Sequence, residues 1–233
     1  MHVAIITARG GSKGIYRKNL ALLNGHPLIA WTIAAALKSG VFDNIIVSSD
    51  DSEILSTSVL YGASPLLRPS HLATDTASSF ETLMHAVHKF QEDVNDKLDC
   101  VTLLQPTSPL RNEEHIKEAS ACLTEQANGV ISVYQPSPHP MKAYRIDNNG
   151  NMEGMYGSDM PYRPRQSLPK YCYANGAIYI FRYASLKNND KFPHENIMPY
   201  FMSQADSVDI DAQEDLILAE KILRERHESI SRI

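Results

Sequence analysis

Apolar runs with the length of β-strands alternate with helix-like segments along almost the whole chain. The strand-like runs lie at residues 3–6, 44–49, 100–105, 129–134 and 175–181. Segments with helical spacing of apolar residues lie at residues 27–39, 52–61, 78–91, 113–125 and 212–226. Alternation of this kind is typical of a mostly parallel sheet with helices packed on its faces. The sequence therefore predicts an α/β fold.

The first predicted strand runs directly into a basic, glycine-rich loop. Its cations and glycines are Arg9, Gly10, Gly11, Lys13, Gly14, Arg17 and Lys18. Glycines allow a tight turn, and backbone N–H groups together with Lys and Arg bind phosphate. The spacing matches neither the P-loop nor the dinucleotide fingerprint. A solvated basic turn is the alternative, but the pattern favours a phosphate loop of another kind.

Composition limits the partners that this loop can serve. The chain has 233 residues, is 43% hydrophobic and carries a formal net charge of -5. A real core is expected, and the acidic balance argues against nucleic-acid binding. Cys100, Cys122 and Cys172 are too widely spaced for a zinc site or a disulfide framework. Without a signal-like or membrane-spanning apolar run, a cytoplasmic protein with a small-molecule partner is expected.

Residues 136–171 interrupt the regular pattern. Prolines recur from Pro136 to Pro169, and glycine and asparagine cluster at 148–157. We interpret the segment as an insertion into a core formed by residues 1–135 and 172–233. A hairpin-like arm would bury Met152, Met155, Tyr156 and Met160 against a second subunit. A flexible surface loop is the alternative.

An acidic pair lies near the C-terminus. Asp209 and Asp211 flank Ile210 at period two and so project to one face of an extended segment. Two carboxylates without nearby His or Cys favour Mg²⁺, which also takes substrate phosphates. Asp211 could instead be the N-cap of the last helix, with Glu214 completing a capping box. Phosphate loop and acidic pair together favour metal-assisted phosphoryl or nucleotidyl transfer.

Five ordered motifs resemble one family. ARGGSKG followed by RKN, then LRPSHLATDTASS, LQPTSPLR, NGAIYI and DSVDIDAQEDL occur in the order and spacing of the acylneuraminate cytidylyltransferases, the CMP-sialic acid synthetases. The chain is similar to a bacterial member from Ala4 to about Leu223. The resemblance implies a Rossmann-like nucleotidyltransferase fold with a protruding dimerisation arm, and a homodimer. It also implies that CTP and Mg²⁺ are used to make a CMP-sugar and pyrophosphate.

The same resemblance assigns the site residues. Positions that match CTP contacts are Arg9, Gly10, Ser12, Lys13, Lys18, Asn19, Arg68 and Ser79, and the catalytic set is Arg9, Lys18 and the metal-binding pair Asp209 and Asp211. Sugar contacts correspond to Gln105, Lys142, Arg165 and Tyr179. Gln105 also ends a predicted buried strand, at the sheet edge where ligands of doubly wound folds bind. Lys142 and Arg165, being in the insertion, could serve the neighbouring subunit's site.

Several alternatives stay open at the level of sequence. Phe192 either lines an acyl-group pocket or simply packs, and packing is favoured. Asp50 and Asp51 either face a ribose or cap a helix, and capping is favoured. The sugar is N-acetylneuraminate, legionaminate or pseudaminate, and the residues around Tyr173 leave legionaminate open. A cytidylyltransferase for 3-deoxy-manno-octulosonate and a non-catalytic nucleotide-sugar binding protein are the rival functions.

Overall fold

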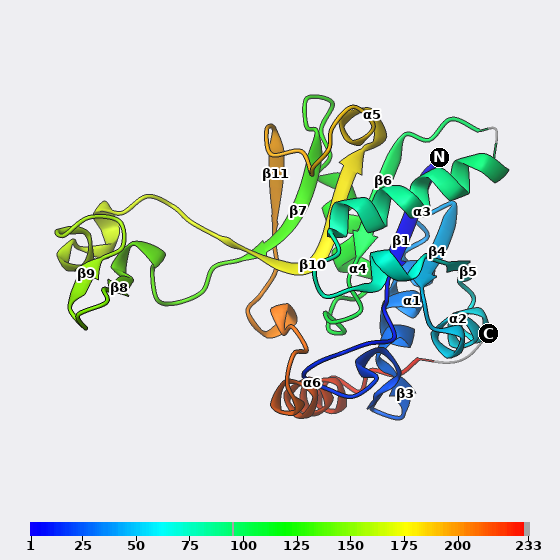
Figure 1. Cartoon of the computed structure of the whole chain (residues 1–233), viewed down its shortest axis with the longest axis horizontal. Coiled ribbons are helices and arrows are strands. Elements are labelled where there is room, and N and C mark those ends of the chain that lie inside the picture. Colours follow the sequence, from blue (N-terminus) through cyan, green and yellow to red (C-terminus); the bar gives the residue numbers. More distant parts are fainter. Residues whose placement is uncertain (95, 231–233) are drawn as a thin grey trace.

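The computed structural model, which describes residues 1–94 and 96–230, is built on one seven-stranded sheet with the strand order β11-β7-β10-β6-β1-β4-β5 (Figure 1). The strands are β1 (His2–Thr7), β4 (Asn44–Ser49), β5 (Ser64–Leu67), β6 (Cys100–Leu104), β7 (Gly129–Tyr134), β10 (Tyr173–Arg182) and β11 (Ile197–Phe201). β10 is antiparallel to both of its neighbours, β6 and β7. The other four pairings are parallel. The predicted α/β fold with a mostly parallel sheet is confirmed.

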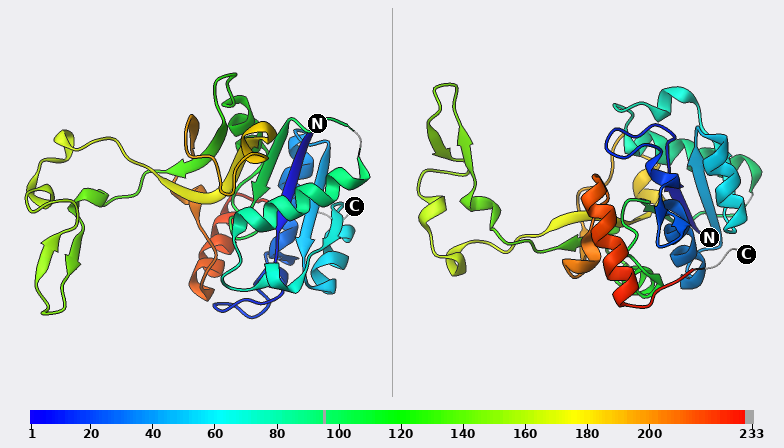
Figure 2. Two further views of the ribbon diagram at one scale, coloured as in Figure 1. Left: turned by 45° about the horizontal axis from the view of Figure 1, so that its top comes forward. Right: turned by 90° about the horizontal axis from the view of Figure 1, so that it is seen from below.

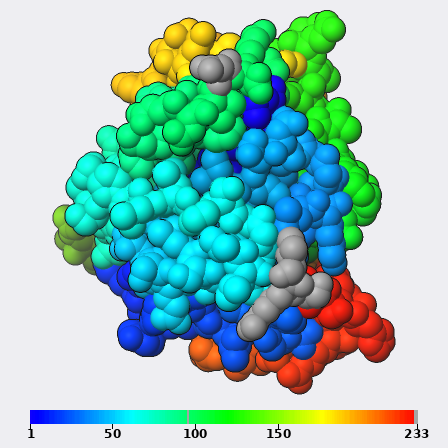
Figure 3. Space-filling view, turned by 90° about the vertical axis from the view of Figure 1, so that its right-hand side faces the viewer, coloured from blue at the N-terminus to red at the C-terminus, as the bar shows by residue number. Residues whose placement is uncertain are grey.

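Helices cover both faces of this sheet. The long helices are α1 (Leu28–Ser39), α2 (Ser52–Leu60), α3 (Ser79–Asp93), α4 (Glu113–Ala121) and α6 (Gln213–Glu225), and α5 (Tyr183–Leu186) is short. One face packs against α1, α2 and α4, and the other packs against α3. α6 packs with Trp31 of α1 and the small β2 (Leu22–Leu23) in a third apolar cluster, beside β3 (His26–Pro27). Figure 3 views the helical side of the core that lies away from the 136–171 segment.

The first strand shows how the sequence pattern becomes this sandwich. Ala4 and Ile6 pack in the cluster of α1, α2 and α4, whereas Val3 and Ile5 pack in the cluster of α3. Side chains alternate between the faces of a strand, so a continuous apolar run serves two layers at once. This is why the strands read as apolar runs and not as alternating patterns.

Two strands of the seven-stranded sheet lie outside the predicted set, and both are edges of that sheet. β5 contains Pro65 and β11 contains Pro199. Proline lacks an N–H donor, so it is tolerated at sheet edges and weakens the strand signal in the sequence. Sequence reasoning therefore places the central strands and misses the two at the edges.

α4 ends at Ala121, four residues before its predicted end. The Arg182 guanidinium on β10 donates to the carbonyls of Thr124, at 2.8 Å, and Ala127, at 2.9 Å. These long-range hydrogen bonds favour a turn over another helical turn. The sequence around residues 122–125 does not indicate these bonds, because their donor lies more than fifty residues further along the chain.

The 136–171 segment extends away from the sheet as a separate lobe (Figures 1 and 2). It contains a hairpin of β8 (Tyr144–Ile146) and β9 (Met152–Gly154), and the 3-10 turns η3 (Pro140–Lys142), η4 (Met160–Tyr162) and η5 (Arg165–Ser167). Large apolar side chains are exposed on it: Ile146, Met152, Met155, Tyr156 and Tyr162. That a second subunit covers them stays a prediction. In the described parts of the chain, no helix is long and apolar enough to cross a membrane.

Candidate active site

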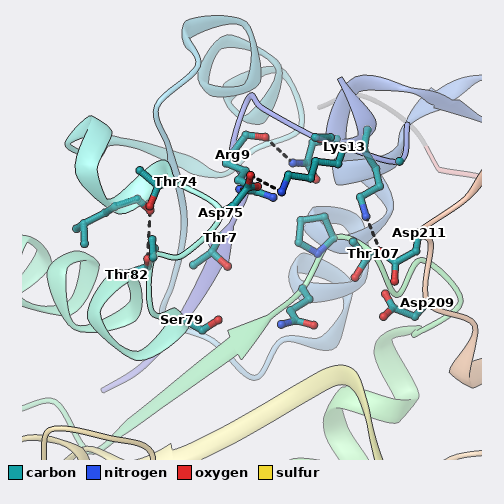
Figure 4. Close-up of a pocket in the computed structure, with 18 of the residues that line it drawn as sticks. Thr7, Arg9, Lys13, Thr74, Asp75, Ser79, Thr82, Thr107, Asp209 and Asp211 are labelled. Atoms are coloured by element: carbon teal, nitrogen blue, oxygen red, sulfur yellow. Dashed lines mark hydrogen bonds and ion pairs between the residues drawn. The ribbon is translucent and has the colours of Figure 1, made fainter. Parts of the chain in front are cut away.

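A cavity of about 440 Å³ lies at the carboxyl ends of β1 and β6 (Figure 4). From β1 the chain proceeds to β4 and β5 on one side, and β6 then pairs on the other side of β1. Such a switch point leaves a crevice that ligands occupy in doubly wound sheets. Ten predicted site residues lie on its wall: Arg9, Ser12, Lys13, Lys18, Asn19, Arg68, Ser79, Gln105, Asp209 and Asp211.

The basic loop after β1 does not send all four cations into the cavity. Arg17 has a left-handed backbone, with φ of 51°. Its guanidinium pairs with Asp51, at 3.0 Å, and with Glu53, at 2.7 Å. The next residue, Lys18, faces the cavity. Arg17 therefore anchors the loop to α2, while Arg9, Lys13 and Lys18 line the cavity.

Two hydrogen bonds hold the loop in shape. The buried Asn19 side chain donates to the Arg9 carbonyl at 2.9 Å. The Gly10 N–H donates to Asp50 Oδ1 at 3.0 Å. Asp51, next in the chain, accepts hydrogen bonds from the Glu53 and Ile54 N–H groups and caps α2. The favoured capping interpretation is therefore confirmed for Asp51. Asp50 instead accepts a hydrogen bond from the backbone of the basic loop. Its position at the end of a strand does not indicate this role.

Asp75 lies between two of the loop's cations, and sequence reasoning missed it (Figure 4). Its Oδ1 is 2.6 Å from Arg9 Nη1, and its Oδ2 is 2.8 Å from Lys13 Nζ. Hydrogen bonds from Lys13 and Arg9 lower the pKa of Asp75. The available signal was an acidic residue in the predicted loop LATDTASS, but nothing in the spacing connects it to residues 9–13. Asp75 holds the place that an anionic ligand of these cations would take.

The acidic pair meets the basic loop on the other side of the cavity. Lys18 Nζ donates to the Ile210 carbonyl at 2.6 Å and to Asp211 Oδ1 at 2.9 Å. At Gly14 a Cβ would lie 2.0 Å from the Asp211 carbonyl oxygen, so only glycine permits this approach. The capping interpretation of Asp211 is wrong, because α6 begins after Ala212 and Asp215 accepts the N–H groups of Asp211 and Ala212. The Asp211 carboxylate is thereby left to the cavity.

Asp209 and Asp211 form a donor set that suits a hard cation. Desolvation, and then the Asp211 charge, raise the pKa of Asp209. A cation bound beside the carboxylate would lower that pKa again. Within residues 1–94 and 96–230 no cluster of three or more His, Cys, Asp or Glu side chains is arranged for a metal. Mg²⁺ uses one or two carboxylates and completes its shell with water and phosphate oxygens. The residues present fit that ion.

A family model described as cytidylyltransferase matches residues 3–222. The chain belongs to the cytidylyltransferase family. It is 37% identical to a CMP-N,N'-diacetyllegionaminic acid synthase of Legionella pneumophila, over 98% of both chains. It is 36% identical to an N-acylneuraminate cytidylyltransferase of Escherichia coli, over 97% of this chain and 52% of that protein. It is 33% identical to a pseudaminic acid cytidylyltransferase of Campylobacter jejuni, over 98% of both.

Solved structures confirm the nucleotidyltransferase fold. A CMP:2-keto-3-deoxy-manno-octonic acid synthetase complexed with CTP superposes with a TM-score of 0.72 at 18% identity, covering 97% of this chain and 99% of that one. The 4-diphosphocytidyl-2C-methyl-D-erythritol synthase of Anaerococcus prevotii has a TM-score of 0.65 at 16% identity, covering 96% of each chain. At these identities the likeness concerns the fold.

In the cytidylyltransferase, Arg68 lies deep in the cavity wall. Its side chain is 5% exposed and its Nη2 lies 3.8 Å from Asp50 Oδ1. Burial lowers the pKa of Arg68. Its Nε lacks a hydrogen-bond partner among the described residues. A partly unpaired, buried donor on the wall suits recognition of a polar ligand group.

Four predicted residues of the cytidylyltransferase are not on this wall. Gly10 turns its N–H to Asp50. Tyr179 is half-buried in β10, and the Asp209 charge contributes to raising its pKa after desolvation. Lys142 donates to the carbonyls of Pro161 and Arg163 inside the lobe. Arg165 reaches Ser137 Oγ at 3.5 Å. The two lobe residues thus lie apart from their own chain's cavity.

Phe192 follows the favoured interpretation of simple packing. Its ring stacks on Phe181 with centroids 5.3 Å apart and meets Phe80 edge-on at 5.4 Å. These contacts belong to the core cluster beneath α3. They explain the residue without a ligand.

Proposed function

We propose that the cytidylyltransferase transfers the CMP group of CTP to a nonulosonic acid, a nine-carbon α-keto acid sugar, and releases pyrophosphate. One observation carries the proposal: Arg9, Lys13 and Lys18, the amide of Gln105 and the carboxylates of Asp209 and Asp211 all face one cavity. Relatives named for legionaminic, neuraminic and pseudaminic acids support the sugar class. The legionaminic acid relative, matched over 98% of both chains, makes a legionaminate the first sugar to test.

The cations act on the triphosphate. The anomeric oxygen of the sugar attacks the α-phosphorus of CTP, the bond to the bridging oxygen of the β-phosphate breaks, and the hydroxyl proton leaves to solvent. Arg9, Lys13 and Lys18 would neutralise the charge that grows on the leaving pyrophosphate. The Ile210 carbonyl accepts a hydrogen bond from Lys18 and so holds its ammonium beside the Asp211 carboxylate.

Asp209 and Asp211 are the residues that would hold Mg²⁺. Bound there, the ion would supply charge neutralisation at the phosphates and lower the pKa of a hydroxyl beside it. Thr107 supports the segment that carries the pair, because its carbonyl accepts the Ile210 N–H at 2.8 Å. The chain itself thus fixes the spacing of the two carboxylates.

Two walls of the cavity would recognise the base and the sugar. Arg68 and Ser79 lie on the wall formed by residues 68–82 and would contact the cytidine. Gln105, which follows β6, would contact the sugar. Lys142 and Arg165 would act on the partner's site, since both lie in the exposed lobe and a carboxylate sugar calls for such cations. The homodimer and a cytoplasmic location, where CTP is available, belong to the same proposal.

The experiment is Mg²⁺-dependent pyrophosphate release from CTP with four acceptors: a di-N-acetyl legionaminate, N-acetylneuraminate, pseudaminate and 3-deoxy-manno-octulosonate. Lys18→Ala is expected to lower kcat/KM by about 100-fold or more, as loss of a transition-state charge contact does. Lys89→Ala is the matched control, because Lys89 is exposed on α3 and pairs with Glu92.

Turnover of a nonulosonic acid that fails in Lys18→Ala and survives in Lys89→Ala supports the proposal. Turnover of 3-deoxy-manno-octulosonate alone assigns the sugar to the rival class. If none of the four acceptors yields pyrophosphate while CTP still binds, the chain is a nucleotide-binding protein and the catalytic proposal fails.

A further inference from the structure

Arg111 is a buried cation that the proposed reaction leaves unused. It is 1% exposed and is among the largest fully buried side chains of the protein. Its Nε and Nη2 have no hydrogen-bond partner within residues 1–94 and 96–230. Burial lowers its pKa to about 9, with no neighbouring carboxylate opposing the effect. Burying an unpaired guanidinium costs free energy that an apolar side chain would avoid.

The bonds that Arg111 does make reach the backbone of Gln105, which lines the cavity, and that of its neighbour strand β10. Nη1 donates to the Gln105 carbonyl and to the Ala177 carbonyl, each at 3.2 Å. Gln105 follows β6, and Ala177 lies in β10 where the register with β7 shifts between Ala174 and Tyr179. One nitrogen therefore ties the end of one strand to an irregular stretch of its antiparallel neighbour.

That stretch of β10 forms the surface behind the Gln105 side chain. Gly176 has φ of +79°, and a Cβ there would lie 2.7 Å from Gln105 Oε1. Ser108 lies in the turn that follows β6, and its Oγ donates to the Asn175 carbonyl at 3.4 Å. This bond is a second link between that turn and β10. The Gln105 amide thus lies against two backbone segments that Arg111 bridges.

We propose that Arg111 is a positioning residue that fixes the Gln105 amide for the acceptor sugar by bridging the Gln105 and Ala177 carbonyls. The inference rests on the proposed sugar-binding role of Gln105. Arg111→Lys keeps the positive charge, but the flexible stem of lysine does not hold one donor nitrogen between the two carbonyls as the rigid guanidinium plane does. Loss of the bridge is expected to weaken acceptor binding and to leave CTP binding intact, because the CTP contacts lie on other segments.

The test is steady-state kinetics with the best acceptor on wild type, Arg111→Lys, Arg111→Met, Gln105→Ala and the double variant Gln105→Ala/Arg111→Lys. Arg111→Lys is expected to raise the acceptor KM by about 10-fold, with the CTP KM within about twofold of wild type. In the Gln105→Ala background the same substitution is expected to have almost no further effect on that KM, because residues acting through one group are not additive.

A stability control separates positioning from general damage. Val130→Ala removes buried volume in β7, which β10 separates from β6 in the sheet. It is expected to lower the melting temperature and leave both KM values unchanged. If Arg111→Met does not fold, Arg111→Lys carries the test, with the CTP-dependent rise in melting temperature reporting an intact nucleotide site.

Each remaining outcome has one meaning. An unchanged acceptor KM in Arg111→Lys, or equal effects with and without Gln105, overturns the positioning role of Arg111. An unchanged KM in Gln105→Ala alone removes the proposed role of Gln105. Absence of turnover in the wild type concerns the proposed function and not Arg111.

Discussion

At the scale of single residues, we expect Asp75 to compete with a nucleotide for two cations. Its carboxylate contacts Arg9 and Lys13, both cavity-lining cations. The contacts are partly exposed to solvent, so each ion pair is weak. A triphosphate that takes over the two cations must first replace these pairs.

Asp75→Asn is therefore expected to strengthen CTP binding, with a Kd lower by about 2- to 10-fold. Isothermal titration with CTP measures the change, and Glu92→Gln on the exposed face of α3 is the control with equal loss of charge. A weaker affinity in Asp75→Asn would mean that the carboxylate supports the nucleotide site instead of competing for it.

At the scale of elements, the basic loop after β1 contacts the segment 209–211 that precedes α6, and this contact brings the cations and the acidic pair to one cavity. Gly14 packs on the Asp211 backbone, whereas a Cβ at Gly11 would meet nothing within 4 Å. The two glycines lie in the same loop, yet only one of them is a contact point between elements.

Gly14→Ala is expected to displace the 209–211 segment and to lower kcat/KM by at least about 10-fold, because sub-ångström placement of charged groups governs such catalysis. Gly11→Ala is the matched control and should stay within about threefold of wild type. Circular dichroism of both variants is the check that they fold. Equal losses in the two variants would locate the effect in loop flexibility and not in the Asp211 contact.

At the scale of the whole molecule, the exposed lobe predicts self-association. Met152 and Met155 are 62% and 53% exposed on a segment that stands clear of the core. Light scattering is expected to find a dimer for the wild type and a monomer for Met152→Glu/Met155→Glu. Glu substitutions at Val59 and Leu60, exposed on α2, are the control. A wild-type monomer at micromolar concentration would contradict the proposed dimer.

Acid sensitivity of the fold is a second property of the whole molecule. Desolvation lowers the pKa of His2 from 6.5 to about 4, although the Asp43 charge opposes the shift. The unfolded chain then binds more protons between pH 6.5 and about 4, so the free energy of unfolding falls as the pH is lowered through that window. Urea unfolding across this range should show the decline, with a shallower slope in His2→Gln.

His194→Gln, at an exposed position, is the control for that measurement. A slope in His2→Gln equal to that of the wild type would assign the acid sensitivity to other groups. His2 opens β1, and its Nε2 lies 2.7 Å from Thr102 Oγ1 on the neighbouring β6.

The sequence by itself determined the central strands, most helix starts and the residue types of the cavity, because these follow from local patterns. Apolar runs fill two layers, and Asp51 and Ser78 cap their helices within a few residues. Ordered motifs also identified the family. All of this information lies within short stretches of the chain.

Only the tertiary structure decided what depends on distant partners. Arg17 is directed away from the cavity by Asp51 and Glu53, and Asp75 is brought to Arg9 and Lys13 across more than sixty residues. The edge strands β5 and β11 exist because a neighbouring strand supplies their hydrogen bonds. Arg111 is a cation in sequence and a buried bridge in the fold, since burial and partners are set by packing and not by spacing along the chain.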